Sequence, residues 1–225
     1  MQKVIFVASD FHYGENQTEV LVPFLKLLTM AKQWNASLFL NGDLFNYWFE
    51  NKGRVPQSCD PFLSGLKKAI EGGLKVTVLR GNRDFLMSDE FVKITGADLV
   101  RDEKLVIEDL KVVITHGDQY DKSLKYQIFR SIVRSTMIRF LTRCVSVSFL
   151  LGVINYLRKP KLSQKLYSLP EKVLGPDDYK VVLGHYHQEK IRKTENGWVL
   201  FCPAFDASAK VLKISKNDFE FLKVV

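Results

Sequence analysis

Residue types that bind metal ions gather in five short motifs of this 225-residue chain. The motifs are Asp10-Phe11-His12, Gly42-Asp43, Gly81-Asn82-Arg83-Asp84, Thr115-His116-Gly117-Asp118 and Gly184-His185-Tyr186-His187. All four histidines of the sequence lie in them, close to carboxylates and one asparagine. We infer that the histidines share one purpose, and the ordered series points to a hydrolase that uses two metal ions.

The candidate ligands combine imidazole nitrogens with carboxylate and amide oxygens. They are Asp10, His12, Asp43, Asn82, His116, His185 and His187. Asp43 has two oxygens and can bridge two ions. A mixed set of this kind suits Mn²⁺, which we take as the first choice, with Fe, Zn²⁺ and Ni²⁺ as alternatives. Two such ions, about 3.5–4 Å apart, can activate a bridging hydroxide and stabilise the transition state of a phosphate ester.

Each motif follows a short apolar run that predicts a β-strand. The runs are residues 3–8, 37–40, 75–79, 111–115 and 180–183, and helical patterns occur at 18–34, 60–71 and 88–95. Strands that alternate with helices indicate an α/β fold. Open α/β sheets place their sites just past the carboxyl ends of strands, so these strands would bring the motifs together.

The later part of the chain predicts further strands in quick succession. The runs are residues 105–108, 112–115, 191–194, 198–202 and 211–215. Because short turns separate several of them, we expect a second, largely antiparallel sheet. The chain would then form a two-sheet sandwich flanked by helices. Its length fits a single domain over residues 1–225.

The net charge of +8 is concentrated in one segment of the chain. Between Gln119 and Leu169 there are ten lysines and arginines and one acid, Asp121. This segment has a helical pattern, and its uncharged run at 144–157 is shorter than the roughly 20 residues of a membrane span. A basic face beside an apolar run favours contact with an anionic membrane surface over nucleic acid, for which stacking aromatics are sparse. The candidates for this contact are Arg130, Arg134, Lys159 and Lys161.

The five motifs, in this order, resemble those of the calcineurin-like metallophosphoesterase superfamily. The resemblance spans Asp10 to His187 and implies an αββα sandwich. It also implies that one ion would bind Asp10, His12, Asp43 and His187, and the other Asp43, Asn82, His116 and His185. Two further acids, Asp84 and Asp118, would either orient metal-bound histidines or cap turns.

A closer resemblance is to the UDP-2,3-diacylglucosamine pyrophosphatases of lipid A synthesis. It rests on Gly81-Asn82-Arg83-Asp84-Phe85, Gly42-Asp43-Leu44-Phe45 and His116-Gly117-Asp118. It implies that a hydroxide bound to both ions hydrolyses this amphiphilic nucleotide-sugar to UMP and 2,3-diacylglucosamine 1-phosphate. It also implies an inserted helical lid at about residues 120–170 that holds the acyl chains, with Tyr120 and Asp121 as candidate substrate contacts.

Arg83 stands where most members of the superfamily have a histidine. A guanidinium cannot donate a proton at neutral pH, but it can bind phosphate oxygens through two N–H groups. We therefore assign a catalytic role to Asn82 and Arg83, which would stabilise charge on the phosphate. This substitution favours a leaving group that needs little protonation, such as one phosphate of a diphosphate.

The expected location is the cytoplasm, with peripheral contact at the inner membrane. The N-terminal residues lack the pattern of a secretory signal, and the three cysteines form no CxxC pair. The sequence leaves the oligomeric state open.

Two alternative functions remain. Gly184-His185-Tyr186-His187 is followed by Gln188 and departs from the Gly-His-Thr-His of the pyrophosphatases. A broader metallophosphoesterase that acts on other nucleotide or nucleic-acid phosphodiesters is therefore one alternative. The other is a scaffold that keeps the fold without turnover, although such proteins usually lose ligands and this chain keeps all seven.

Overall fold

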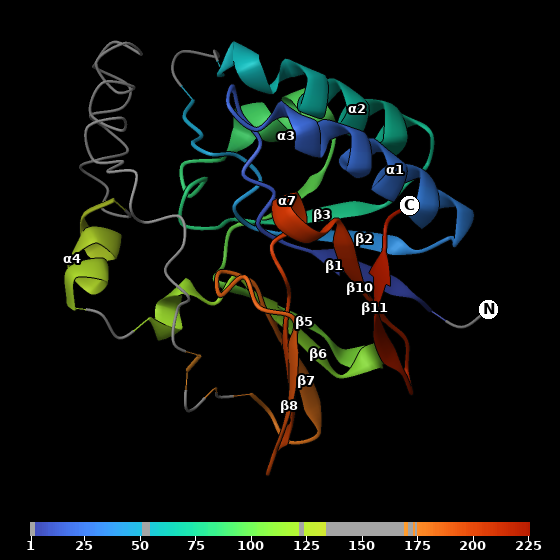
Figure 1. The fold of residues 1–225 in the computed structure, drawn as a ribbon, viewed down its shortest axis with the longest axis vertical. Coiled ribbons are helices and arrows are strands. Elements are labelled where there is room, and N and C mark those ends of the chain that lie inside the picture. Colours follow the sequence, from blue (N-terminus) through green and yellow to red (C-terminus); the bar gives the residue numbers. More distant parts are fainter. Residues whose placement is uncertain (1–2, 51–54, 122–123, 134–168, 171–172, 174) are drawn as a thin grey trace.

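Two β-sheets face each other in the computed structural model, and three helices cover the outer face of one of them (Figure 1). The structure describes residues 3–50, 55–121, 124–133, 169–170, 173 and 175–225. The α/β fold with two sheets and flanking helices that the sequence predicts is confirmed.

The first sheet has six strands in the order β11-β10-β1-β2-β3-β4. Their bounds are β1 Ile5–Ala8, β2 Ser37–Asn41, β3 Val76–Leu79, β4 Asp98–Val100, β10 Lys210–Ile214 and β11 Phe219–Lys223. Strands β1 to β4 are parallel to one another, whereas β10 pairs antiparallel with both β1 and β11. Parallel neighbours need crossover connections. The helices α1 (Leu21–Gln33), α2 (Asp60–Glu71) and α3 (Asp89–Thr95) lie in these three connections.

Apolar residues at helical spacing dock these helices on the sheet. Helix α1 buries Phe24, Leu27, Leu28 and Ala31, which recur with the period of one helix face. Phe24 stacks on Phe62 of α2, with ring centroids 3.7 Å apart. Helix α2 has a proline, Pro61, in its first turn, where the missing N–H costs no helical hydrogen bond.

The second sheet has five strands in the order β5-β6-β7-β9-β8. Their bounds are β5 Lys104–Ile107, β6 Val112–Thr115, β7 Tyr179–Leu183, β8 Lys190–Thr194 and β9 Gly197–Phe201. The sheet is mixed rather than largely antiparallel. The pairs β5–β6 and β8–β9 are antiparallel, as expected, but β6–β7 and β7–β9 pair in parallel. Parallel pairing requires long or crossover connections, whereas a short turn can join only antiparallel strands. The predicted strand at 211–215 is also misassigned, because β10 pairs with β1 in the first sheet.

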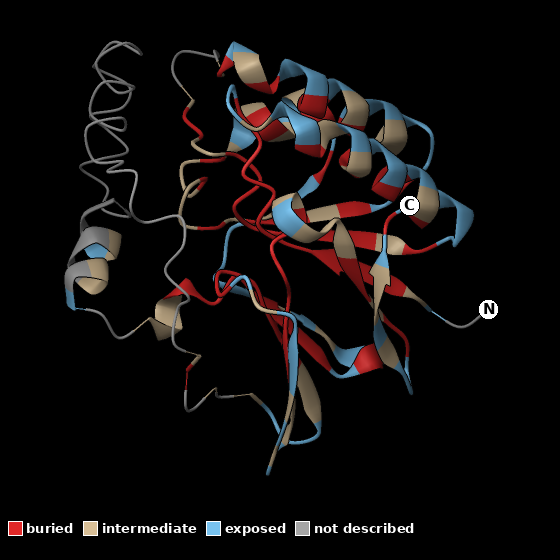
Figure 2. Cartoon of the chain, viewed as in Figure 1, coloured by how far each residue is buried: buried red, intermediate tan, exposed pale blue. Residues whose placement is uncertain are grey.

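The space between the sheets is filled by aliphatic side chains from both. In strand β1, Ile5 and Val7 point toward the second sheet and pack with Ile114 and Val182. Their neighbours Phe6 and Ala8 point the other way, toward the helices. Figure 2 shows the resulting band of buried residues through the centre of both sheets. Strand β1 is therefore fixed on both faces, and the residues that follow it start from a rigid support.

Further helices lie in the connections between these elements. They are the 3-10 helices Thr18–Val20, Gln57–Cys59, Glu108–Leu110 and Asp118–Tyr120, and the α-helices α4 (Leu124–Val133) and α7 (Phe205–Ser208). Only α4 represents the helical segment expected at about 120–170, because most of that segment, with Arg134, Lys159 and Lys161, lies outside the described residues. Within the described ranges, no helix has the length and apolar character needed to cross a membrane.

Candidate metal centre

The polar motifs meet where the strands of the two sheets end. Asp10, Asp43 and Asn82 follow the parallel strands β1, β2 and β3, and His116 and His185 follow the parallel strands β6 and β7. Parallel strands end at the same edge of a sheet, which brings the five residues together. Backbone hydrogen bonds join the first two loops, from Asp10 N to Gly42 O (3.1 Å) and from His12 N to Asp43 O (3.0 Å).

A first group of candidate ligands surrounds Asp10. Its Oδ1 atom lies 3.2 Å from His187 Nε2 and 3.9 Å from His12 Nε2. His12 Nε2 also lies 3.6 Å from Oδ2 of Asp43. One atom each from Asp10, His12 and His187 falls within 4.8 Å of the other two, a separation suited to a shared ion.

A second group surrounds the side-chain oxygen of Asn82. Asn82 Oδ1 lies 3.1 Å from His116 Nε2 and 3.0 Å from His185 Nδ1. His116 Nε2 lies 3.5 Å from Oδ1 of Asp43. Asp43 thus directs Oδ2 toward the first group and Oδ1 toward the second. The structure brings all seven predicted ligands together as two groups that share one carboxylate.

The imidazole nitrogens of two of these histidines are arranged as metal ligands require. His12 Nδ1 lies 2.8 Å from Asp206 Oδ2, while its buried Nε2 has no hydrogen-bond partner among the described residues. His116 Nδ1 lies 2.9 Å from the carbonyl oxygen of Asn41, which can only accept, so Nε2 carries the lone pair that faces Asp43. Ligating histidines in proteins usually have one nitrogen anchored in this way. These residues fit a centre for two divalent ions.

Charge within the centre shifts the pKa of several groups. Burial raises the pKa of Asp10 and Asp43, but contacts with histidines (His187 and His116 at Asp10, His116 and His12 at Asp43) outweigh it, and both lie below the usual range. Burial lowers the pKa of His12, yet the hydrogen bond to Asp206 and the nearby Asp43 raise it to about 9. His185 behaves in the opposite way, because burial and repulsion from His116 lower its pKa to about 4.

Five of the seven candidate ligands have a left-handed backbone. They are Asp10 (φ 60°), His12 (φ 48°), Asp43 (φ 53°), His185 (φ 64°) and His187 (φ 55°). Residues other than glycine rarely adopt this conformation, which costs about 1–2 kcal/mol each. Such strain persists only where the surroundings impose it, and it is typical of functional sites.

Two motif glycines allow the loops to approach this closely. A Cβ atom on Gly81 would lie 2.2 Å from Oδ1 of Asp43, and one on Gly184 would lie 2.0 Å from Oγ of Ser9. Both distances are shorter than real Cβ contacts, so a Cβ atom at either position would force the buried neighbouring atoms to move. The glycines of the third and fifth motifs are thus explained in part by the space that the ligands need.

Arg83 lies directly beside the shared carboxylate. Its Nε is 3.2 Å from Asp43 Oδ2, and its backbone N–H donates to Asp43 Oδ1 at 2.9 Å. The guanidinium also donates to Asn46 Oδ1 at 3.2 Å. Asn46 in turn donates to Gln17, and Gln17 donates to Asp206. The Arg83 side chain is 32% exposed, so it forms part of the wall of the centre that solvent reaches.

The two acids named as possible partners of histidines have different contacts. Asp84 accepts hydrogen bonds from the backbone N–H groups of Gly81 (2.6 Å) and Leu44 (2.7 Å), so it braces two ligand-bearing loops. Burial and the charge of Asp43 raise its pKa to about 6. Asp118 accepts from Tyr126 Oη (3.1 Å) and Arg130 Nε (3.0 Å), which ties helix α4 to the end of β6.

The residues predicted to contact the substrate or a membrane surface lie partly at the centre and partly away from it. Asp121 Oδ2 lies 3.9 Å from His185 Nε2, and Tyr120 is partly buried against the second sheet. The guanidinium of Arg130 is engaged with Asp118 and Glu103. The other three basic candidates, Arg134, Lys159 and Lys161, lie outside the described residues.

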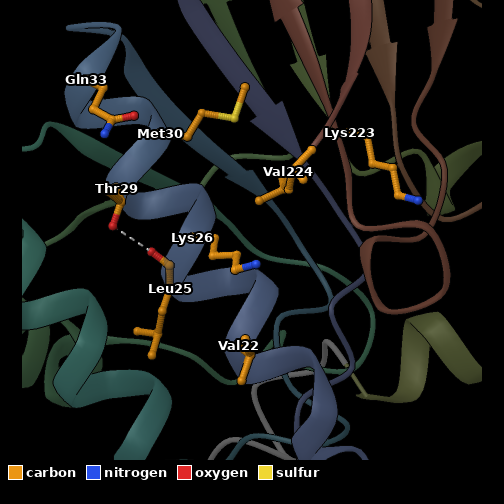
Figure 3. Close-up of a pocket in the computed structure, with 9 residues that line it drawn as sticks. Val22, Leu25, Lys26, Thr29, Met30, Gln33, Lys223 and Val224 are labelled. Atoms are coloured by element: carbon orange, nitrogen blue, oxygen red, sulfur yellow. Dashed lines mark hydrogen bonds between the residues drawn. The ribbon is translucent and has the colours of Figure 1, made fainter.

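Two residues that contribute to the centre lie outside the five sequence motifs. Ser9 Oγ donates to Asp10 Oδ2 at 2.5 Å and is adjacent to a motif, which is the signal that could have identified it. Asp206 contacts His12 from a position 194 residues further along the chain, and no local pattern marks it. A groove on another part of the molecule, drawn in Figure 3, is lined by residues of α1 and by residues 223–225. No histidine, aspartate or glutamate lines it, and it is separate from the metal centre.

Comparison with known proteins gives relatives of similar length. No protein-family model matches the chain. It is 27% identical over 236 residues to the UDP-2,3-diacylglucosamine hydrolase of Haemophilus influenzae (strain PittGG), covering 97% of this chain and 98% of that protein. For the protein of the same name from Pseudomonas fluorescens (strain SBW25), identity is 26% over 207 residues, with coverage of 86% and 83%. For that from Bordetella parapertussis, identity is 35% over 141 residues, with coverage of 60% and 54%.

The fold also has a counterpart among solved structures. The phosphoesterase Yfce from E. coli superposes with a TM-score of 0.52 at 15% identity, covering 98% of this chain and 93% of that one. At this identity the similarity concerns the fold alone. It places the two-sheet arrangement described above among those of known phosphoesterases.

Proposed function

The chain belongs to the calcineurin-like metallophosphoesterases and is a phosphoester hydrolase, and we propose that its substrate is UDP-2,3-diacylglucosamine. Water would add to one phosphorus while the bond between that phosphorus and the bridging oxygen breaks. The products would be UMP and 2,3-diacylglucosamine 1-phosphate. The names of the relatives support this substrate, and the residues of the centre support diphosphate cleavage independently.

The observation that carries the proposal is the position of Arg83. Its guanidinium lies 3.2 Å from the carboxylate shared by the two ligand groups, and a guanidinium group offers hydrogen-bond donors but no transferable proton. A fixed cation there can bind the oxygens of a diphosphate but cannot protonate a leaving alkoxide. A phosphate leaving group needs no such proton, whereas the alcohol of a simple phosphomonoester does. The site is therefore better suited to diphosphates.

The remaining residues would hold the ions and the substrate. Two divalent ions, when bound, polarise phosphoryl oxygens and lower the pKa of bound water; we propose Mn²⁺ in this role. Asp10, His12, Asp43 and His187 would hold one ion, and Asp43, Asn82, His116 and His185 the other. Asn82 directs Oδ1 toward two histidine rings. We expect its Nδ2 group and the guanidinium of Arg83 to donate to phosphoryl oxygens.

We also propose that residues 120–170 bind the lipid part of the substrate and approach an anionic membrane surface. The segment carries ten basic residues and one acid, together with the uncharged run at 144–157. Positive charge next to apolar side chains favours anionic headgroups. Helix α4 connects this segment to the centre through the ring of Tyr126, whose centroid lies 5.5 Å from that of His185.

The test is an assay of the purified, Mn²⁺-loaded protein on three substrates: UDP-2,3-diacylglucosamine, bis-p-nitrophenyl phosphate and single-stranded DNA. We expect UMP from the first at a kcat/KM far above those for the others. Asp43→Ala should abolish the reaction, whereas Asp89→Ala, which removes an exposed acid paired with Arg101, should leave it intact. Robust turnover of DNA or the diester without UMP release would refute the substrate but retain the hydrolase.

A further inference from the structure

Asp206 reaches the metal centre from the C-terminal part of the chain. It lies in the short helix α7, just after strand β9. Its Oδ2 atom is 2.8 Å from Nδ1 of His12, and the side chains of His12 and Asp206 are only 4% and 18% exposed. The contact is therefore a largely buried hydrogen bond to a charged acceptor, which is among the stronger kinds.

The backbone around Asp206 is fixed to the first ligand motif. The N–H of Phe205 lies within hydrogen-bond distance of the carbonyl oxygens of Ser9 (3.0 Å) and Asp10 (3.1 Å). The Phe205 ring stacks on Phe11, with centroids 4.4 Å apart. Both residues are fully buried. The carboxylate of Asp206 is thus held at a set position relative to the loop that carries His12.

This arrangement determines which nitrogen of His12 faces the centre. Nδ1 donates its hydrogen to Asp206, so Nε2 must present its lone pair between Asp10 and Asp43 when the ring is neutral. Gln17 Nε2 lies 3.4 Å from the same carboxylate oxygen and restricts its rotation. The anchor of His116, by contrast, is a neutral backbone carbonyl. The two anchored histidines of the centre therefore have partners of different charge.

We propose that Asp206 is a positioning residue that fixes the tautomer and orientation of His12 and thereby sets the affinity of the ion site around Asp10. The inference rests on the metal centre of the proposed function but not on its substrate. Loss of such a partner typically weakens metal binding by about 10- to 100-fold. Only the ion held by His12 should be affected, since Asp206 contacts none of the ligands around Asn82 in the described structure.

The experiment is a titration of the metal-free full chain with Mn²⁺, in which free ion is followed by electron paramagnetic resonance. Wild type should show two sites. Asp206→Ala should weaken one of them about 10- to 100-fold and leave the other within threefold. Asp206→Asn, which keeps the shape but not the charge, should have an intermediate effect. Asp109→Asn removes an exposed acid that pairs with Lys3 and should change neither site.

The proton spectrum of the Zn²⁺-loaded protein gives a second readout. The Nδ1–H of His12 should appear as a slowly exchanging, strongly deshielded signal in wild type and disappear in His12→Ala. That signal should shift or vanish in Asp206→Asn. If Asp206→Ala fails to fold, Asp206→Asn decides the matter, because it fills the same volume.

The outcomes separate this inference from the metal centre itself. Unchanged Mn²⁺ binding in His12→Ala would refute the assignment of the ion site around Asp10. Weaker binding in His12→Ala, with wild-type affinity in both Asp206 variants, would refute the role of Asp206 and leave the centre standing. An equal loss at both ion sites in Asp206→Asn would also overturn the proposal, because it would indicate a general structural effect.

Discussion

The guanidinium of Arg83 is in direct contact with the carboxylate of Asp43, with Nε 3.2 Å from Oδ2. The same oxygen faces His12, and the other oxygen of Asp43 faces His116. One carboxylate therefore joins the two ligand groups and also orients the cation that would bind phosphate. An anion that enters the centre meets the ligands and the arginine as one preformed surface, which is the arrangement that lowers the reorganisation needed in a transition state.

Removal of the arginine should slow diphosphate cleavage. We expect Arg83→Ala to lower kcat/KM for UDP-2,3-diacylglucosamine by roughly 10²–10³-fold, the typical effect of losing one preorganised donor. Mn²⁺ affinity should not fall, because no candidate ligand is removed. Steady-state kinetics and a metal titration check both parts. Wild-type kcat/KM in Arg83→Ala would contradict the role given to this residue.

Replacement by histidine should change the choice of leaving group. Arg83→His supplies a group that can donate a proton near neutral pH. We expect the rate on a series of phosphodiesters to depend less steeply on leaving-group pKa in this variant than in wild type. The slope of log kcat/KM against leaving-group pKa measures this. Arg83→Lys serves as the control, since it preserves a cation without adding a useful acid, and its slope should match that of wild type.

Asn46 should influence substrate binding through Arg83. The Asn46 amide accepts from the guanidinium at 3.2 Å and is itself held by Gln17. Loss of one hydrogen bond to a charged group costs about 1.5–3 kcal/mol, so Asn46→Ala should raise KM by roughly tenfold or more with a smaller effect on kcat. The double variant Asn46→Ala, Arg83→Ala should be no worse than Arg83→Ala alone. If the losses of kcat/KM in the two single variants instead added up in the double variant, Asn46 would not act through Arg83.

The stability of the metal-free protein should depend on pH through His12. Burial lowers the pKa of His12, but the hydrogen bond to Asp206 and the neighbouring Asp43 raise it from 6.5 to about 9. A raised folded-state pKa stabilises the fold fully below pH 6.5, and this contribution is lost as pH rises through 9. We expect a loss on the order of 1–3 kcal/mol over that window.

Urea unfolding in the presence of EDTA, at a series of pH values, measures this loss. Asp206→Asn removes the carboxylate that raises the pKa of His12, so its stability should fall less over the same window. Comparison of the two proteins cancels the contributions of other titrating groups. Parallel pH profiles for wild type and Asp206→Asn would contradict the prediction.

A methyl group at Gly184 should disrupt the centre. The added Cβ would lie 2.0 Å from Ser9 Oγ and 2.9 Å from Asp10 Oδ2, both of which are buried. Gly184→Ala should therefore lower the free energy of unfolding by about 1–3 kcal/mol and weaken Mn²⁺ binding. Gly72→Ala is the matched control, because the nearest atom is the mobile Nζ of Lys32 at 3.0 Å. Calorimetry and metal titration compare the two variants. If both had equal effects on the free energy of unfolding and on Mn²⁺ affinity, the steric explanation would be wrong.

The sequence predicts the first sheet and its helices well because their patterns are local. The helix predicted at 60–71 has these bounds in the structure, and each predicted strand that precedes a ligand is present. The second sheet was predicted less well. The pairing of β6 with β7 joins residues that are 68 positions apart, such as Val112 and Lys180, and local periodicity does not encode such contacts. Strand β4 has only three residues, too few for a recognisable alternation.

The candidate centre shows the same division. The spacing of the motif predicts that His185 and His187 lie in the same centre. It cannot predict which oxygen of Asp43 faces which histidine ring. The part played by Asp84 also depends on tertiary structure, since the backbone N–H groups that donate to it lie on two different loops. Asp206 could not be found from sequence spacing, because it meets His12 only in the folded chain, where Phe205 stacks on Phe11 and its N–H is bonded to the loop after β1.

The left-handed backbone conformation at five candidate ligands lowers the stability of the fold, whereas the side chains at these positions are needed to bind the ions. At each of these positions glycine would relieve about 1–2 kcal/mol of backbone strain, so replacement by glycine at the partly exposed His187 should make the protein harder to denature. The same replacement would remove a ligand. Selection for heat resistance alone would therefore favour substitutions at these positions. The selected variants would be more stable than the wild type but would have lost their hydrolase activity.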